Sequence, residues 1–154
     1  MAFSWEASVE DVAALLPQRT KGEFGTDGEF KDDGTTTPSK KQVENLLKKA
    51  ASRIAGKLNV TEAKDICPNG PLELAREVHA LRAAMMVELT FFANQLRTDQ
   101  SPYEKLKEQY DEGLKDLLVD YENQCGDDDG EGLGGEKMPR GNFPHSGRWG
   151  RRRF

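Results

Sequence analysis

Residues that could carry catalysis or hold a metal are few in this sequence. The only histidines are His79 and His145, and no Ser or Cys stands in the G-x-S-x-G context of an activated nucleophile. His79 lies within an apolar helical pattern with no visible partner, which is typical of a partly buried polar side chain rather than a general base. Cys67 and Cys125 have neither a C-x-x-C motif nor a histidine cluster nearby. We therefore expect no disulfide and no zinc site, and unpaired thiols suit a reducing cytosol.

Two other ligand-binding patterns are incomplete. The Gly-Lys pair at 56–57 resembles part of a phosphate loop, but Ala51 and Leu58 stand where the motif needs a glycine and a hydroxyl residue. Acidic loops beginning at Asp27 and Asp127 lack the glutamate that a calcium loop carries at its twelfth position. Solvated acidic loops account for both. We expect an interaction protein that is not an enzyme and has no cofactor.

The C-terminal segment has the most distinctive chemistry. Residues 126–136 carry five acids and no base, whereas residues 137–154 carry six bases and no acid. Its arginines and Trp149 suit a groove on a partner protein, since both residue types are enriched at binding hot spots. They equally suit nucleic acid, with arginines on phosphates and the indole on a base, or a tail that only aids solubility. The expected partner-binding residues are Phe143, Arg148, Trp149, Arg151, Arg152, Arg153 and Phe154.

Composition divides the chain into three parts. Residues 38–121 hold 36 of the 55 apolar residues and three of the 15 glycines, so only this part can bury a core. We expect an N-terminal helix and loop at 1–37, a helical core at 38–121 and an extended arm at 122–154. Seven of the twelve aromatics lie outside the core, which predicts that both flanks are docking arms. These seven are Phe3, Trp5, Phe24, Phe30, Phe143, Trp149 and Phe154.

Helical periodicity predicts an all-α fold, a small four-helix bundle. Ser8 and Asp11 form a capping box for a helix over 8–16, and Thr37 followed by Pro38 predicts the cap and first residue of a helix that continues to Leu58. Further helices are expected over 72–96 and 101–121, the latter opened by a capping box at Ser101. The turn-rich connection over 18–37 also admits a two-stranded hairpin. No apolar run approaches the roughly 20 residues that span a bilayer, so we expect a soluble protein that is not secreted.

The apolar stripes of the three longer helices predict the core, and the third helix is apolar on more than one face. It is therefore expected to be the central helix, or one that also packs against a neighbouring subunit. The expected core residues are Val43, Leu46, Leu47, Ile54, Leu74, Val78, Leu81, Met85, Leu89, Leu106, Tyr110, Leu114 and Leu117.

Charge differs between the second and fourth helices. The second carries a net charge of +5, and residues 101–121 have three lysines against six acids. This contrast favours a heterologous contact in which the basic face of one copy meets the acidic face of the next, and it is equally compatible with two solvated faces. The expected oligomer-interface residues are Lys48, Arg53, Lys57, Glu108, Asp111, Glu112 and Asp116.

The order of these signals resembles the head-to-tail adaptor, or connector, proteins of long-tailed bacteriophages, particularly those of actinobacteria. The resemblance covers about residues 8–121, and the Thr-Thr-Pro-Ser and Ser-Pro-Tyr-Glu segments weigh most. It is carried by Leu15-Leu16-Pro17, by residues 30–39 (FKDDGTTTPS), by residues 74–76 (LAR) and 83–92 (AAMMVELTFF), and by residues 101–107 (SPYEKLK).

This resemblance implies an all-helical subunit that assembles into a ring, commonly of twelve copies, beneath a portal ring. Such rings extend the channel through which genomic DNA passes, and a stopper or tail-completion protein docks beneath them. The implied location is the virion neck, and the host cytoplasm during assembly, with no membrane partner. In such proteins the C-terminal arm tends to engage the portal, but the tail here is longer than the pattern requires.

Overall fold

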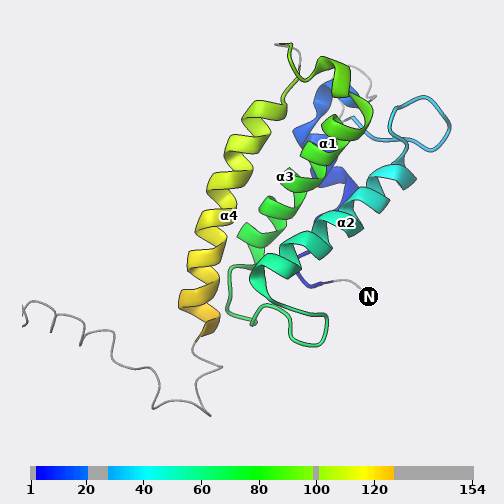
Figure 1. Cartoon of the computed structure of the whole chain (residues 1–154). Helices are drawn as coiled ribbons and strands as arrows, with labels where there is room; N and C mark the ends of the chain where they lie inside the picture. The colour runs from blue at the N-terminus through cyan, green and yellow to red at the C-terminus, as the bar shows by residue number, and fades with distance from the viewer. Residues whose placement is uncertain (1–2, 21–27, 99–100, 127–154) are drawn as a thin grey trace, which may run out of the picture.

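The computed structural model describes residues 3–20, 28–98 and 101–126, and these residues form a helical bundle (Figure 1). The described part contains no strand, so the predicted all-α class is confirmed. Residues 21–27, in the middle of the connection where a hairpin was considered, lie outside the described residues. The elements are α1 (Val9–Leu15), η1 (Pro17–Arg19), α2 (Lys40–Leu58), α3 (Leu72–Phe91), η2 (Ala93–Gln95) and α4 (Tyr103–Cys125), where η marks a single 3₁₀ turn.

Helix α3 is the centre of the bundle, as its apolar composition predicts. It packs against α1, α2 and α4, and it lies between α2 and α4 in Figure 1. Its middle turns are buried on most sides, with Arg82 and Met86 half-buried, which explains why its apolar residues do not form one stripe. At the contact with α4, a Cβ added to Gly113 would lie 3.1 Å from a methyl group of Val78. The glycine therefore allows the two helices to approach closely.

Side-chain caps set the beginnings of the first two helices. Ser8 caps α1 in the predicted box with Asp11. The prediction for α2 is wrong by two residues, because Ser39 rather than Thr37 is the cap and Pro38 precedes the helix. The Ser39 hydroxyl accepts the Gln42 N–H, and the Gln42 side chain accepts the Ser39 N–H in return. This reciprocal pair satisfies two backbone donors, which Thr37 and Pro38 could not do.

The link between α3 and α4 also departs from prediction. Helix α3 ends at Phe91 instead of Leu96 and is followed by η2. The predicted capping box at Ser101 is absent, and Pro102 precedes α4 without a side-chain cap. The Ser101 hydroxyl instead donates to a carboxylate oxygen of Glu88 at 3.1 Å. The same hydroxyl oxygen accepts the N–H of Tyr103, the first residue of α4, at 3.3 Å, so Ser101 links the buried carboxylate to the beginning of the helix.

The predicted core is confirmed with one exception. Leu74 and Leu114 are half-buried at its edge, and Leu89 is 41% exposed, so its assignment to the core was wrong. Glu88 takes the inward position at this turn of α3, and the next residue points about 100° further round the helix. The fully confirmed residues are Val43, Leu46, Leu47, Ile54, Val78, Leu81, Met85, Leu106, Tyr110 and Leu117.

Trp5 and Phe30 of the N-terminal flank belong to the core, so these two are not docking groups, and Phe24 lies outside the described residues. Trp5 is fully buried and Phe30 nearly so, while Phe3 stacks on the Trp5 ring at 4.9 Å between centroids. The indole N–H of Trp5 donates to Asp65 at 2.8 Å, and both the backbone N–H and the hydroxyl of Ser4 donate to the same carboxylate. These bonds hold the pKa of Asp65 below its usual value despite its partial burial.

Cys67 and Cys125 form a disulfide, so the expectation of unpaired thiols is wrong. The bond joins the loop before α3 to the last residue of α4, two positions 58 residues apart in sequence that only the packing of α4 on α3 brings together. A Cβ on Gly70 would lie 2.7 Å from Sγ of Cys125, so the absence of a side chain there makes room for the crosslink. With the thiols paired, the argument for a reducing compartment no longer holds.

Candidate functional site

His79 has a structural role in the centre of the bundle. Its Nδ1 accepts the backbone N–H of Ala7 at 2.8 Å, and its Nε2 lies 2.8 Å from the carbonyl oxygen of Leu47. The ring is therefore the neutral Nε2–H tautomer, bridging the segment before α1 to α2. It is fully buried, and this burial lowers its pKa below the ordinary value of 6.5. The expectation that His79 is a buried polar residue agrees with this environment.

The buried imidazole predicts a loss of stability in mild acid. The unfolded chain takes up a proton at His79 below pH 6.5, whereas the folded chain resists it, so unfolding is favoured as the pH falls through 6.5. The cost is at most about 1.4 kcal/mol per pH unit between the two pKa values. The hydrogen bond to the Leu47 carbonyl, and then the charges of Glu6 and Asp11, act against this lowering of the pKa without reversing it. Urea denaturation at pH values from about 8 to about 5 measures the effect, because this range brackets the ordinary histidine pKa.

The control for this prediction is His79→Gln, which keeps a donor toward Leu47 but does not titrate. It should be less stable than the wild type at neutral pH, and the gap should narrow as the pH falls. A difference in the free energy of unfolding between the wild type and His79→Gln that stays constant across the pH range would contradict a neutral buried imidazole.

A buried ion pair lies at the C-terminal end of α3. Glu88 is fully buried in α3, and its carboxylate accepts from Nε and Nη2 of Arg19 at 2.9 and 3.0 Å. Arg19 Nη2 also donates to Gln95 at 2.9 Å, and the guanidinium lies 3.6 Å from the centroid of the Phe92 ring. With Ser101, this cluster joins η1, α3, η2 and the beginning of α4. A glutamate within the run of apolar residues 83–92 is the one sequence signal that could have revealed it.

Three charged side chains, Arg53, Arg82 and Asp111, act on Tyr110, which is buried on α4. Burial raises the pKa of Tyr110, while Arg82 and Arg53 favour the ionised form and Asp111 opposes it. The Arg82 guanidinium lies 5.5 Å from the tyrosine ring centroid.

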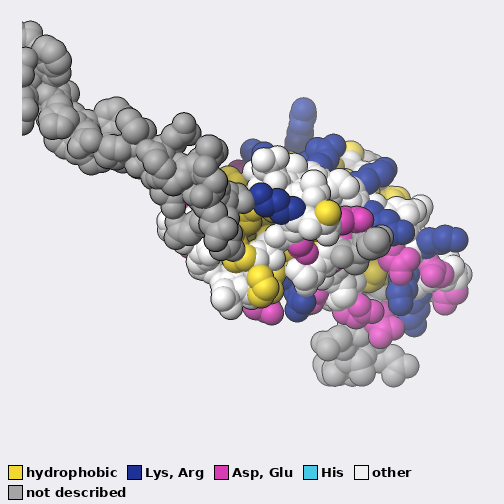
Figure 2. Space-filling model, turned by 90° about the horizontal axis from the view of Figure 1, so that it is seen from below, with side chains coloured by type: hydrophobic (Ala, Val, Ile, Leu, Met, Phe, Trp, Pro, Cys, Tyr) yellow, Lys and Arg dark blue, Asp and Glu magenta, His cyan; other side chains and the backbone are white. Residues whose placement is uncertain are grey.

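All seven expected interface residues are exposed. In the described part of the chain, none of them forms an ion pair within the subunit. Lys48 lies about 140° round α2 from Arg53, and on α4 Glu108 and Glu112 share one row. Figure 2, which looks at the molecule from below, shows Lys and Arg side chains interspersed with Asp and Glu along the side on which α2 lies in Figure 1. The basic face of α2 and the acidic face of α4 are therefore available for contact with other molecules.

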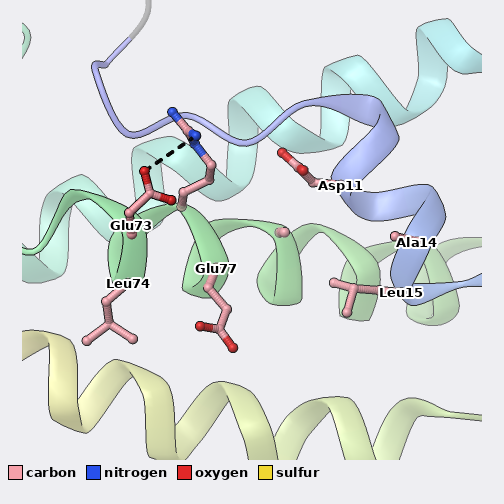
Figure 3. Close-up of a pocket in the computed structure, with 8 residues that line it drawn as sticks. Asp11, Ala14, Leu15, Glu73, Leu74 and Glu77 are labelled. Atoms are coloured by element: carbon pink, nitrogen blue, oxygen red, sulfur yellow. Dashed lines mark ion pairs between the residues drawn. The ribbon is translucent and has the colours of Figure 1, made fainter.

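A groove of about 450 Å³ lies between α1 and the first half of α3 (Figure 3). Leu74 and Glu77 project from one side of α3, and Leu15 of α1 lies further along it. The charged groups are three carboxylates against one arginine, and Arg76 pairs with Glu73 at 3.8 Å. The lining residues are Asp11, Ala14, Leu15, Glu73, Leu74, Arg76, Glu77 and Ala80. Sequence reasoning missed this groove because two segments about 60 residues apart in sequence form it.

The residues expected to bind a partner lie outside the described residues. This holds for all seven, from Phe143 to Phe154. Among the described residues, no three His, Cys, Asp or Glu side chains gather in a way that could hold a metal ion. Nor do the helices of this described part include one that is both long and apolar enough to cross a bilayer.

Comparison with known proteins gives no assignment. No protein-family profile matches the chain, and no curated protein or solved structure matches it significantly.

Proposed function

We propose that this chain is a structural subunit of a head-to-tail adaptor ring, which sits beneath a portal ring and joins it to a stopper or tail-completion protein. The observation that carries the proposal is the pair of exposed, oppositely charged faces on α2 and α4, with α3 packed between these helices. A ring built head to tail needs two different patches on different sides of one subunit. The exposed lysines of α2 and the exposed acids of α4 support the presence of two such patches.

Electrostatics supports such a contact because neither face is neutralised within the subunit. Lys48 and Glu112 are both exposed and without an ion pair in the described residues. A single exposed pair contributes only about 0.2–1 kcal/mol, but a closed ring repeats each pair in every copy. In this proposal the channel carries genomic DNA, the ring has on the order of twelve copies as the resemblance implies, and residues 143–154 engage the portal.

Charge reversal on one face at a time tests the ring. We expect the Lys41→Glu/Lys48→Glu variant, and separately the Glu108→Lys/Glu112→Lys variant, to associate about 30-fold more weakly than the wild type, because two pairs of about 1 kcal/mol each are lost per contact. Light scattering over a range of concentrations measures the assembly. The pairs share a row on their helices, seven and four residues apart.

Mixing the two variants supplies the decisive control. The reversed face of one variant is opposite in charge to the reversed face of the other, so every contact between unlike variants again joins a basic and an acidic face. The mixture should therefore recover assembly, as a ring in which the two variants alternate. The proposal would be contradicted if the wild type does not assemble, or if the mixture assembles no better than each variant does alone.

Nucleic-acid binding is a second candidate function, favoured by the same unpaired cations on α2. Its signature differs, since a basic face that binds phosphates loses affinity steeply with salt. The Lys41→Glu/Lys48→Glu variant should then lose DNA in a gel shift, whereas Glu108→Lys/Glu112→Lys should bind it at least as well as the wild type. The adaptor proposal expects both variants to fail in assembly.

A further inference from the structure

The groove between α1 and α3 has the features of a docking site for a basic, aromatic peptide segment. Its apolar lining, called its floor below, is formed by Ala14, Leu15, Leu74 and Ala80, and three carboxylates also line it. Asp11 is committed to the cap of α1 and Glu73 pairs with Arg76, but Glu77 has no partner within the described residues. The lining therefore has a net charge of −2 and one carboxylate free to pair with a cation.

The chain itself contains a segment with complementary chemistry. Residues 148–154 (RWGRRRF) carry four arginines, one tryptophan and one phenylalanine, with no acid. An indole fits the apolar floor, because an aromatic ring buries a large apolar area with few rotatable bonds. Arginines beside it would face the carboxylates along the groove. Hot-spot anchors of protein interfaces have this combination of aromatic and guanidinium groups.

The place where the arm leaves the bundle also favours this groove. The disulfide holds Cys125, the last residue of α4, against the loop that leads into α3. Helix α3 begins at Leu72, and the groove begins one residue later, at Glu73. The intervening residues 127–147 span up to about 70 Å when extended, far more than the roughly 10 Å of α3 that lines the groove. Attachment to the same chain raises the effective concentration of the segment to the order of millimolar.

We propose that residues 148–154 dock in the groove between α1 and α3 of their own chain, with Trp149 on the apolar floor and an arginine paired with Glu77. This self-docking goes beyond the ring proposed above and does not depend on it. Where the same arm also engages a portal, the two sites compete for it. The docked subunit then keeps its arm occupied until a partner site of higher affinity is present.

Fluorine NMR of the full chain labelled with fluorotryptophan tests the docking. The protein has two tryptophans, so two resonances are expected, and Trp149→Phe identifies the second. We expect the Trp149 resonance to have a small solvent-isotope shift in the wild type, typical of a ring shielded from water. In Glu77→Lys, or in high salt, it should move to the position and isotope shift of an exposed tryptophan. The resonance of Trp5, which is fully buried in the core, reports that the fold is unchanged.

Glu44→Lys is the matched control, because it makes the same charge change at an exposed position of α2 that does not line the groove. Its Trp149 resonance should stay at the wild-type position. The proposal is overturned if Trp149 is equally exposed in the wild type and in Glu77→Lys. A Trp149 signal that moves to the exposed position on dilution would overturn docking within one chain and assign the segment to a second copy instead.

Discussion

Replacing Arg19 with methionine is expected to lower the free energy of unfolding by about 3–5 kcal/mol. The substitution leaves the carboxylate of Glu88 fully buried with the Ser101 hydroxyl as its remaining partner from this cluster. A buried charge without its counter-ion carries the full cost of desolvation. Urea denaturation at neutral pH measures the loss.

The double variant Arg19→Met/Glu88→Leu is the control for this prediction. It removes both charges and fills the space with apolar atoms, so it should recover most of the lost stability. The single variant Arg19→Met should keep the lower free energy of unfolding. If Arg19→Met lowers the free energy of unfolding by less than about 1 kcal/mol, the pair contributes no more than an exposed salt bridge. The contact of η1, α3, η2 and the beginning of α4 then does not depend on it.

Reduction of the disulfide is expected to cost about 4 kcal/mol of stability. The bond closes a loop of 58 residues, and a crosslink over a loop of this length restricts the unfolded chain by about that much. Loss of the bond also frees the end of α4 from the turn at Gly70, which is closed by its N–H bond to the Cys67 carbonyl at 2.8 Å. Urea denaturation with and without a thiol reductant measures the difference.

A Cys67→Ser/Cys125→Ser variant separates this effect from any other action of the reductant. It should match the reduced wild type, and the reductant should not change it. Equal stability of the oxidised and reduced wild type, or titration of two free thiols in the folded protein without reductant, would contradict the predicted role of the crosslink.

The helices could be predicted from sequence because their signals are local. Apolar residues repeat at three- and four-residue steps over α2 and α4, and the serine cap of α1 acts on an N–H three residues away. The same locality explains the errors at helix ends. Thr37 and Ser39 are both good caps by type, and only the arrangement of the backbone decides which hydroxyl meets a free N–H.

The errors inside the fold have one cause, which is contact between residues far apart in sequence. Trp5 resembles a docking aromatic until Asp65 and His79 are placed beside it. In the sequence Glu88 only interrupts an apolar segment, and its role as the partner of Arg19 is visible only in the folded chain. In each case the residue type was unusual for its segment, so the sequence marked the position without indicating the partner.

Sequence alone determined the helical class and the opposite charges of α2 and α4, because each depends on periodicity and composition within one segment. It offered the central place of α3 as one of two alternatives. Tertiary structure decided the pairing of Cys67 with Cys125, the burial of Glu88 with Arg19, and the groove between α1 and α3. Each of these joins segments separated by roughly 60 residues or more, and the energy of such a contact depends on packing that no single segment contains.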